Sequence, residues 1–100
     1  MSKYKVLIAE DDRDIINVLT LYLNNAGYDV EAAFDGFEAL NLLECSDFDM
    51  VILDIMMPGM NGYETAIEIR KKHNMPIMFL SAKNQDIDKI MGLDIGADDY

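Results

Sequence analysis

Cysteine, proline and basic residues are scarce in this sequence, and each scarcity excludes a class of protein. One cysteine, Cys45, leaves no partner for an intrachain disulfide, which excludes a small disulfide-built domain and favours a reducing compartment. We expect Cys45 to be a buried structural thiol, because it lies in an apolar helical pattern. Only 8 lysines and arginines accompany 19 aspartates and glutamates. The net charge of -11 therefore argues against direct binding to nucleic acid or to an anionic membrane surface.

Long apolar runs are also missing. No stretch approaches the roughly 20 apolar residues that a membrane-spanning helix needs, and no cleavable apolar region precedes Glu10. No repeat, low-complexity segment or linker divides the 100 residues, of which 51% are hydrophobic. These features suit one domain with a modest core, and we expect it to be cytoplasmic.

Short apolar runs alternate with helical patterns along the whole chain. We expect strands over residues 6–9, 28–33, 50–53 and 76–80, and helices over residues 13–26, 37–45, 63–73 and, more weakly, 85–95. Residues 97–100 begin one further element. Strands that alternate with helices predict an α/β fold, a doubly wound and mostly parallel sheet with helices on both faces.

The run of residues 51–53 stops at a single carboxylate, Asp54. Pro58-Gly59 and Asn61-Gly62 follow within a few residues, so the chain must turn there. Open α/β sheets bind their ligands at the carboxyl ends of the strands, and Asp54 stands at such an end. An ordinary turn residue is the alternative interpretation of Asp54.

A second acidic cluster, Glu10-Asp11-Asp12, follows the apolar run of residues 6–9. If the two strands are neighbours, three or four carboxylates meet at one edge of the sheet. Like charges so close raise each other's pKa unless a cation neutralises them, and Mg²⁺ is the natural oxygen-liganded occupant. Asp11 or Asp12 is also suited to cap the helix that follows, and the two roles are compatible.

With these motifs in place, the chain resembles the receiver domain of bacterial two-component response regulators. The matching segments are Glu10-Asp11-Asp12, Asp54 with Met57-Pro58 and Gly62, Leu80-Ser81-Ala82, and Gly96-Ala97-Asp98-Asp99-Tyr100. The resemblance implies one receiver domain over residues 1–100 with a flavodoxin-like sheet in the order 2-1-3-4-5. The last strand and last helix are then expected to be incomplete or missing.

The resemblance also implies the roles of the acidic residues. Asp54 would be the phosphoacceptor, to which a sensor histidine kinase donates a phosphoryl group. Asp11 and Asp12 would help to bind Mg²⁺, Asp12 more directly, with Asp54 and the backbone carbonyl of Met56 as further ligands. An output domain or a downstream protein would read the state of Asp54, so the domain would be a switch rather than an enzyme.

Two further roles fall near the end of the chain. The resemblance implies that Ser81 hydrogen-bonds the phosphoryl group and that Tyr100 is an aromatic that changes rotamer on activation. Plainer interpretations are a helix cap or loop residue for Ser81 and a partly buried aromatic for Tyr100. The family continues to a lysine and a fifth helix beyond Tyr100, so we expect poor phosphorylation and association into a homodimer or swapped oligomer.

Two other functions stay open at this point. One is a receiver-like binding module that works without phosphorylation. The other is a Mg²⁺-dependent phosphohydrolase with an aspartyl-phosphate intermediate. Such an enzyme typically needs a second acidic residue two positions after the nucleophile, and that position is Met56.

Overall fold

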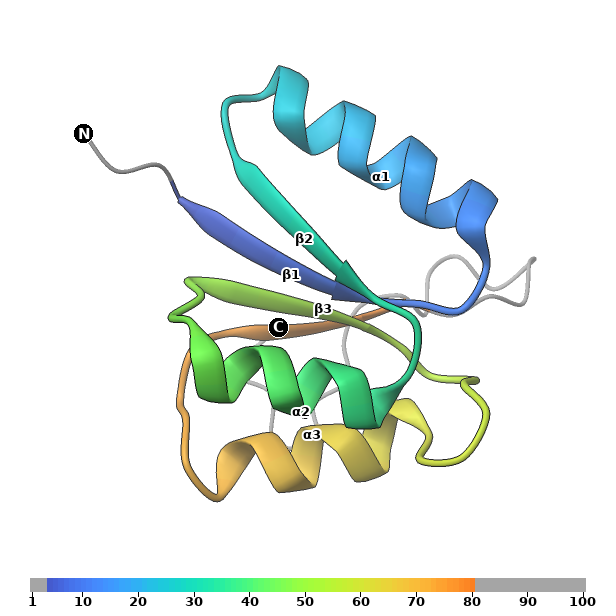
Figure 1. Cartoon of the computed structure of the whole chain (residues 1–100), viewed down its shortest axis with the longest axis vertical. Helices are drawn as coiled ribbons and strands as arrows, with labels where there is room; N and C mark the ends of the chain where they lie inside the picture. Colours follow the sequence, from blue (N-terminus) through green and yellow to red (C-terminus); the bar gives the residue numbers. More distant parts are fainter. Residues whose placement is uncertain (1–3, 81–100) are drawn as a thin grey trace.

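The computed structural model describes residues 4–80, in which strands and helices alternate strictly (Figure 1). The elements are β1 (Lys5–Ala9), α1 (Arg13–Asn25), β2 (Asp29–Ala33), α2 (Gly36–Cys45), β3 (Met50–Asp54), α3 (Gly62–Arg70) and β4 (Ile77–Leu80). The four strands form one parallel sheet in the order β2-β1-β3-β4. The predicted α/β class and the predicted order of these four strands are confirmed. None of these helices is long and apolar enough to cross a membrane.

The sheet is the middle of three layers. α1 covers one face, and α2 and α3 cover the other (Figure 1). Side chains alternate along each strand, so Val6 and Ile8 pack with Ile52 on the α1 face, while Leu7 and Ala9 face α2 and α3. Both faces of β1 are therefore buried, which explains its continuous apolar run.

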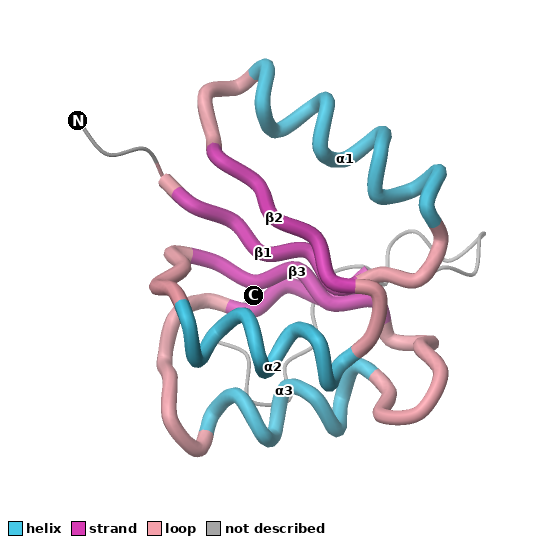
Figure 2. Tube along the Cα trace, viewed as in Figure 1, coloured by secondary structure: helices cyan, strands magenta, loops and turns pink. Residues whose placement is uncertain are grey.

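The larger part of the core lies between the sheet and the pair α2 and α3. Its buried members are Leu7, Ala9, Ala33, Ala39, Leu43, Phe48, Val51, Leu53, Met57, Ala66, Ile69, Ile77 and Phe79. This layer fixes β3 and its carboxyl end. The loops that follow β1, β2 and β3 all leave the sheet on the same side of the molecule, to the right in Figure 2.

Polar side chains fix the start of each helix. Asp12 caps α1, Asp35 caps α2, and Asn61 caps α3 in a reciprocal capping box with Glu64. After α1, Gly27 adopts a φ of 100°, as predicted for the residue that ends this helix. These capping residues thus determine where the helices begin, on the side of the sheet where the acidic residues lie.

Most predicted bounds are within one residue of those observed, and other details differ more. α3 ends at Arg70 rather than at residue 73. Cys45 is exposed, because α2 turns Ala39 and Leu43 to the core and Cys45 lies half a turn beyond Leu43. Ile67 is 54% exposed for a similar reason, since Ala66 and Ile69 occupy the buried side of α3. The predicted helix over residues 85–95 and the element over residues 97–100 lie outside the described residues.

Candidate functional site

Two acidic residues are placed side by side by the sheet itself. The parallel register of β1 and β3 pairs Ile8 with Ile52 and Ala9 with Leu53, so Glu10 and Asp54 follow as the next neighbours. The backbone N–H of Glu10 still donates to the carbonyl of Ala33 at 3.0 Å, which holds Glu10 in line with β1. The strand pairing therefore brings both carboxylates to the carboxyl edge of the sheet.

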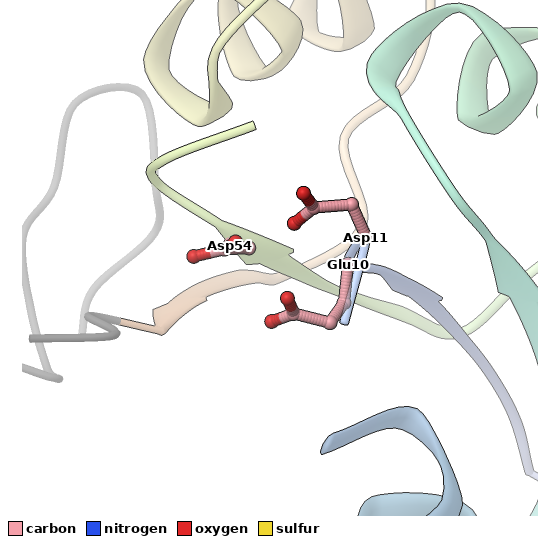
Figure 3. Close-up of side chains that lie close together, drawn as sticks. All are labelled: Glu10, Asp11 and Asp54. Carbon is pink, nitrogen blue, oxygen red and sulfur yellow. The ribbon is translucent and has the colours of Figure 1, made fainter. Parts of the chain in front are cut away.

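Asp11 completes a cluster of three carboxylates. Glu10, Asp11 and Asp54 each offer one oxygen that lies within 4.8 Å of those of the other two (Figure 3). Asp54 is 1% exposed and Glu10 is 2% exposed, whereas Asp11 is open to solvent. The strand end that carries Asp54 is therefore enclosed and not open to solvent.

Hydrogen bonds satisfy only part of this cluster. The Oε2 atom of Glu10 accepts from the N–H of Asp12 at 3.0 Å, and the Oδ1 atom of Asp54 accepts from the N–H of Met56 at 3.3 Å. The Oε1 atom of Glu10 is buried and has no hydrogen-bond partner among residues 4–80. A buried carboxylate oxygen without a partner is costly, so this atom points to a missing proton or cation.

Burial and neighbouring charges shift the acidity of the two buried groups. Burial raises the pKa of Glu10 from 4.5 to about 7, and the neighbouring charge of Asp54 adds to the shift. Burial also raises the pKa of Asp54; the charges of Asp11 and Asp12 act in the same direction, and the N–H of Met56 opposes it. Both groups therefore hold protons more tightly than free carboxyl groups do.

The cluster differs from the predicted ligand set at one position. We expected Asp12 beside Asp11 and Asp54, but the structure brings Glu10 there. Asp12 is exposed, and its Oδ1 atom accepts from the N–H of Asp14 at 2.9 Å as the N-cap of α1. The sequence did contain a signal for Glu10. Glu10 follows Ile8 by two positions, and Asp54 follows Ile52 by two positions. Because side chains alternate along a strand, Glu10 and Asp54 are expected on the same face of the sheet.

The other predicted site residues divide into two groups. Met56 lies next to the cluster, and its backbone contacts Asp54 while its side chain is 61% exposed. Ser81 and Tyr100 lie outside the described residues, so their predicted roles stay predictions.

The donor set fits a hard divalent cation. All three side chains offer carboxylate oxygens, two of them are buried, and one of those oxygens has no other partner within the described part of the chain. Mg²⁺ binds through one or two carboxylates while it keeps several waters, so three carboxylates with one exposed side suit it.

Residues 6–100 match the sequence model of the response regulator receiver domain. This chain belongs to the receiver domain family. The resemblance inferred from the four motifs is thereby confirmed. Receiver domains are signalling domains and in general not enzymes, and membership supports a role in phosphorelay signalling.

Solved receiver structures agree with this fold. A response regulator receiver domain from Francisella is 39% identical, with a TM-score of 0.81 over 97% of this chain and 81% of its own. The chemotaxis protein CheY4 of Vibrio cholerae is 34% identical, with a TM-score of 0.79 over 88% and 76%. The response regulator TrrA of Thermotoga maritima, solved in complex with Mg²⁺-BeF, is 39% identical, with a TM-score of 0.76 over 81% and 71%.

Proposed function

We propose that this receiver domain accepts a phosphoryl group on Asp54 from a sensor histidine kinase and thereby switches an output domain or partner protein. The observation that carries the proposal is the cluster of Glu10, Asp11 and Asp54 at the carboxyl ends of two neighbouring strands. Phosphoryl transfer mostly requires positioning and neutralisation of charge, and a buried acceptor beside two further carboxylates meets the first need.

Mg²⁺ is the cofactor that we assign to this site. Glu10, Asp11 and Asp54 would hold it, together with the backbone carbonyl of Met56, and Asp12 is replaced in this set by Glu10. When bound, the ion supplies positive charge that offsets both the carboxylates and the phosphoryl oxygens. The Mg²⁺-BeF complex of the similar Thermotoga protein supports the assignment by analogy.

The carboxylate of Asp54 is the nucleophile in this proposal. It must be ionised to attack phosphorus, and the bond from phosphorus to the donor atom breaks as the new oxygen–phosphorus bond forms. Burial opposes ionisation by raising the pKa of Asp54, whereas the N–H of Met56 donates to the ionised form. Glu10 has a second effect: with its pKa raised to about 7 it keeps its proton, and its side-chain hydrogen bond to Asp54 favours the ionised form of Asp54.

The other residues have supporting roles. Asp11 is the exposed member of the cluster, so the donor approaches Asp54 from its side. Asp12 starts α1 and, through its N–H, orients the carboxylate of Glu10. Ser81 would donate to the phosphoryl group and Tyr100 would change rotamer, as the family resemblance implies.

Two competing functions are separated by one pair of assays. Turnover of a generic phosphate ester would support a phosphohydrolase, which Met56 disfavours because it stands where the acid/base residue is needed. Mg²⁺-dependent phosphorylation of one residue without turnover supports the switch. A folded protein that shows neither activity and binds no Mg²⁺ would leave the phosphorylation-independent binding module.

A further inference from the structure

Gly62, the first residue of α3, packs directly against the backbone that carries Asp54. A Cβ atom at this position would lie 2.8 Å from the Cα atom of Ile55 and closer still to the carbonyl oxygen of Asp54. Real Cβ atoms essentially never come within 3.0 Å of such atoms, and backbone atoms have no flexible end that can swing aside. Any larger residue at this position must therefore push α3 and the end of β3 apart.

Glycine is required at position 62 because there is no space for a side chain, and not because of the backbone conformation. Gly27 and Gly59 are the glycines with positive φ within residues 4–80, and Gly62 is not among them. Alanine also has a higher intrinsic helix propensity than glycine, so Gly62→Ala would by itself favour α3. A loss of function in that variant cannot be assigned to a weaker helix.

The same contact closes the loop that carries Met56. The N–H of Gly62 donates to the carbonyl of Ile55 at 2.9 Å, so residues 56–61 form a loop with both ends joined. Met56 in that loop donates its N–H to Asp54. The capping box between Asn61 and Glu64 fixes the other side of the junction, with bonds of 2.9 and 2.8 Å.

We propose that Gly62 is a positioning residue for phosphorylation: its lack of a side chain lets α3 hold the backbone of Asp54 and the loop of Met56 in the geometry that the site requires. This inference rests on the proposed function, because it assigns to Gly62 the placement of the phosphoacceptor and of one proposed metal ligand. Gly62 touches neither the metal nor the donor, and it acts through Asp54 and Ile55.

Gly36 offers a matched control. It is also buried and also the first residue of its helix, α2, and a Cβ atom there would crowd the Oγ1 atom of Thr65. That Oγ1 atom donates a 2.8 Å hydrogen bond to the carbonyl of Asn61, so Thr65 must shift and the bond is strained or lost. The Cβ atom would also lie 3.3 Å from the Cβ atom of Met60, a contact that a shift of a few tenths of an ångström relieves. Gly36→Ala therefore disturbs the packing of α2 and α3 without meeting the backbone of Asp54.

The test compares Gly62→Ala and Gly36→Ala with the unmodified protein. Calorimetry gives the Mg²⁺ affinity, intact mass gives the rate of phosphorylation by acetyl phosphate, and circular dichroism checks folding. Misplacement of a reacting group or of the groups around a metal typically costs 10-fold to 100-fold. We expect losses of about this size in both quantities for Gly62→Ala and changes within about threefold for Gly36→Ala.

If Gly62→Ala does not fold, a second pair of variants tests the positioning role of Gly62. Asn61→Ala removes the cap that fixes Gly62, and Asn61→Ser restores a neutral capping group. We expect Asn61→Ala to weaken Mg²⁺ binding severalfold and Asn61→Ser to recover it. Both variants are compared where circular dichroism shows them fully folded, because a loss of stability alone then leaves the Mg²⁺ affinity unchanged.

Each outcome bears on the inference. Equal Mg²⁺ affinities in Gly62→Ala and Gly36→Ala, or an Asn61→Ala variant that binds Mg²⁺ as the unmodified protein does, would overturn it. If the unmodified protein binds Mg²⁺ but takes up no phosphoryl group, the proposed function fails, and the Mg²⁺ affinities still decide the role of Gly62. An unmodified protein that binds no Mg²⁺ overturns both.

Discussion

Glu10 and Asp54 lie next to each other at the carboxyl ends of β1 and β3, and the charge of Asp54 makes Glu10 harder to ionise. The register that pairs Ile8 with Ile52 places them there, so the repulsion is built into the sheet. Burial raises the pKa of both groups, and the charge of Asp54 adds to the shift of Glu10. The state with both carboxyl groups ionised therefore carries an electrostatic penalty, at the position where we propose that a cation and a phosphoryl group bind.

We expect this penalty to appear as a pH-dependent loss of stability without metal. Unfolded Glu10 loses its proton near pH 4.5, whereas folded Glu10 keeps it up to about pH 7. Between these values the folded state binds more protons, so the free energy of unfolding falls as the pH rises. The loss is at most about 3.5 kcal/mol, since one pKa unit corresponds to about 1.4 kcal/mol. Urea unfolding in chelator-treated buffer from pH 4 to pH 8 measures it.

Glu10→Gln tests the origin of that loss. The variant should be more stable than the unmodified protein at pH 8 and equally stable at pH 4. Glu44→Gln is the control, because Lys72 lowers the pKa of the exposed Glu44. The stability that Glu44 contributes is present above its unfolded pKa and disappears as the pH falls. If Glu10→Gln leaves the pH dependence unchanged, Glu10 is not its source.

Mg²⁺ should stabilise the folded protein through Asp11 and not through the side chain of Asp12. A ligand that binds only the folded state adds about 2.7 kcal/mol at 100 times its Kd. Asp11→Asn should remove most of the rise in melting temperature that Mg²⁺ produces. Asp12→Asn, which keeps a good capping group, should retain that rise. The reverse pattern would restore Asp12 as the metal ligand and remove Asp11.

Asp12 should instead matter for α1. Asp12→Ala removes the side chain that accepts from the N–H of Asp14, and loss of an N-cap typically costs about 1 kcal/mol. Chemical unfolding without metal measures this cost, and Asp12→Asn should recover most of it. An Asp12→Ala variant as stable as the unmodified protein would contradict the capping role.

The orientation of α3 gives a test of the fold. Ile69 is fully buried between α3 and the sheet, whereas Ile67 is 54% exposed two residues earlier. Ile69→Ala should lower the free energy of unfolding by about 2–5 kcal/mol, and Ile67→Ala by about 0.5 kcal/mol or less. Similar losses in the two variants would mean that the helix faces another way.

The strands could be predicted from the sequence because a strand that is buried on both faces has a continuous apolar run. The cap of α1 followed from the acidic residues after β1, one of which, Asp12, holds that position. The orientation of α2 was harder to predict, because Cys45 belongs to an apolar helical pattern but lies outside its buried side. The structure brings Glu10 rather than Asp12 beside Asp11 and Asp54, and the identity of the metal ligands stays a prediction.

The close contact of Gly62 had no sequence signal of its own. A glycine at position 62 is equally consistent with a turn. Only the short distance to Ile55 in the structure shows that lack of space requires glycine there. Whether Asp54 is enclosed likewise depends on what packs around the strand end, which periodicity does not describe.

The most direct test of the central claim is the intact mass of the protein after incubation with Mg²⁺ and acetyl phosphate. Asp54→Asn and Asp49→Asn should be treated in parallel, because Asp49 is an exposed carboxylate that immediately precedes β3, near the opposite end of that strand. We predict one phosphoryl adduct in the unmodified protein and in Asp49→Asn, and none in Asp54→Asn or without Mg²⁺. An adduct that survives in Asp54→Asn, or a folded, Mg²⁺-binding protein that never acquires one, would contradict the assignment of Asp54 as the phosphoacceptor.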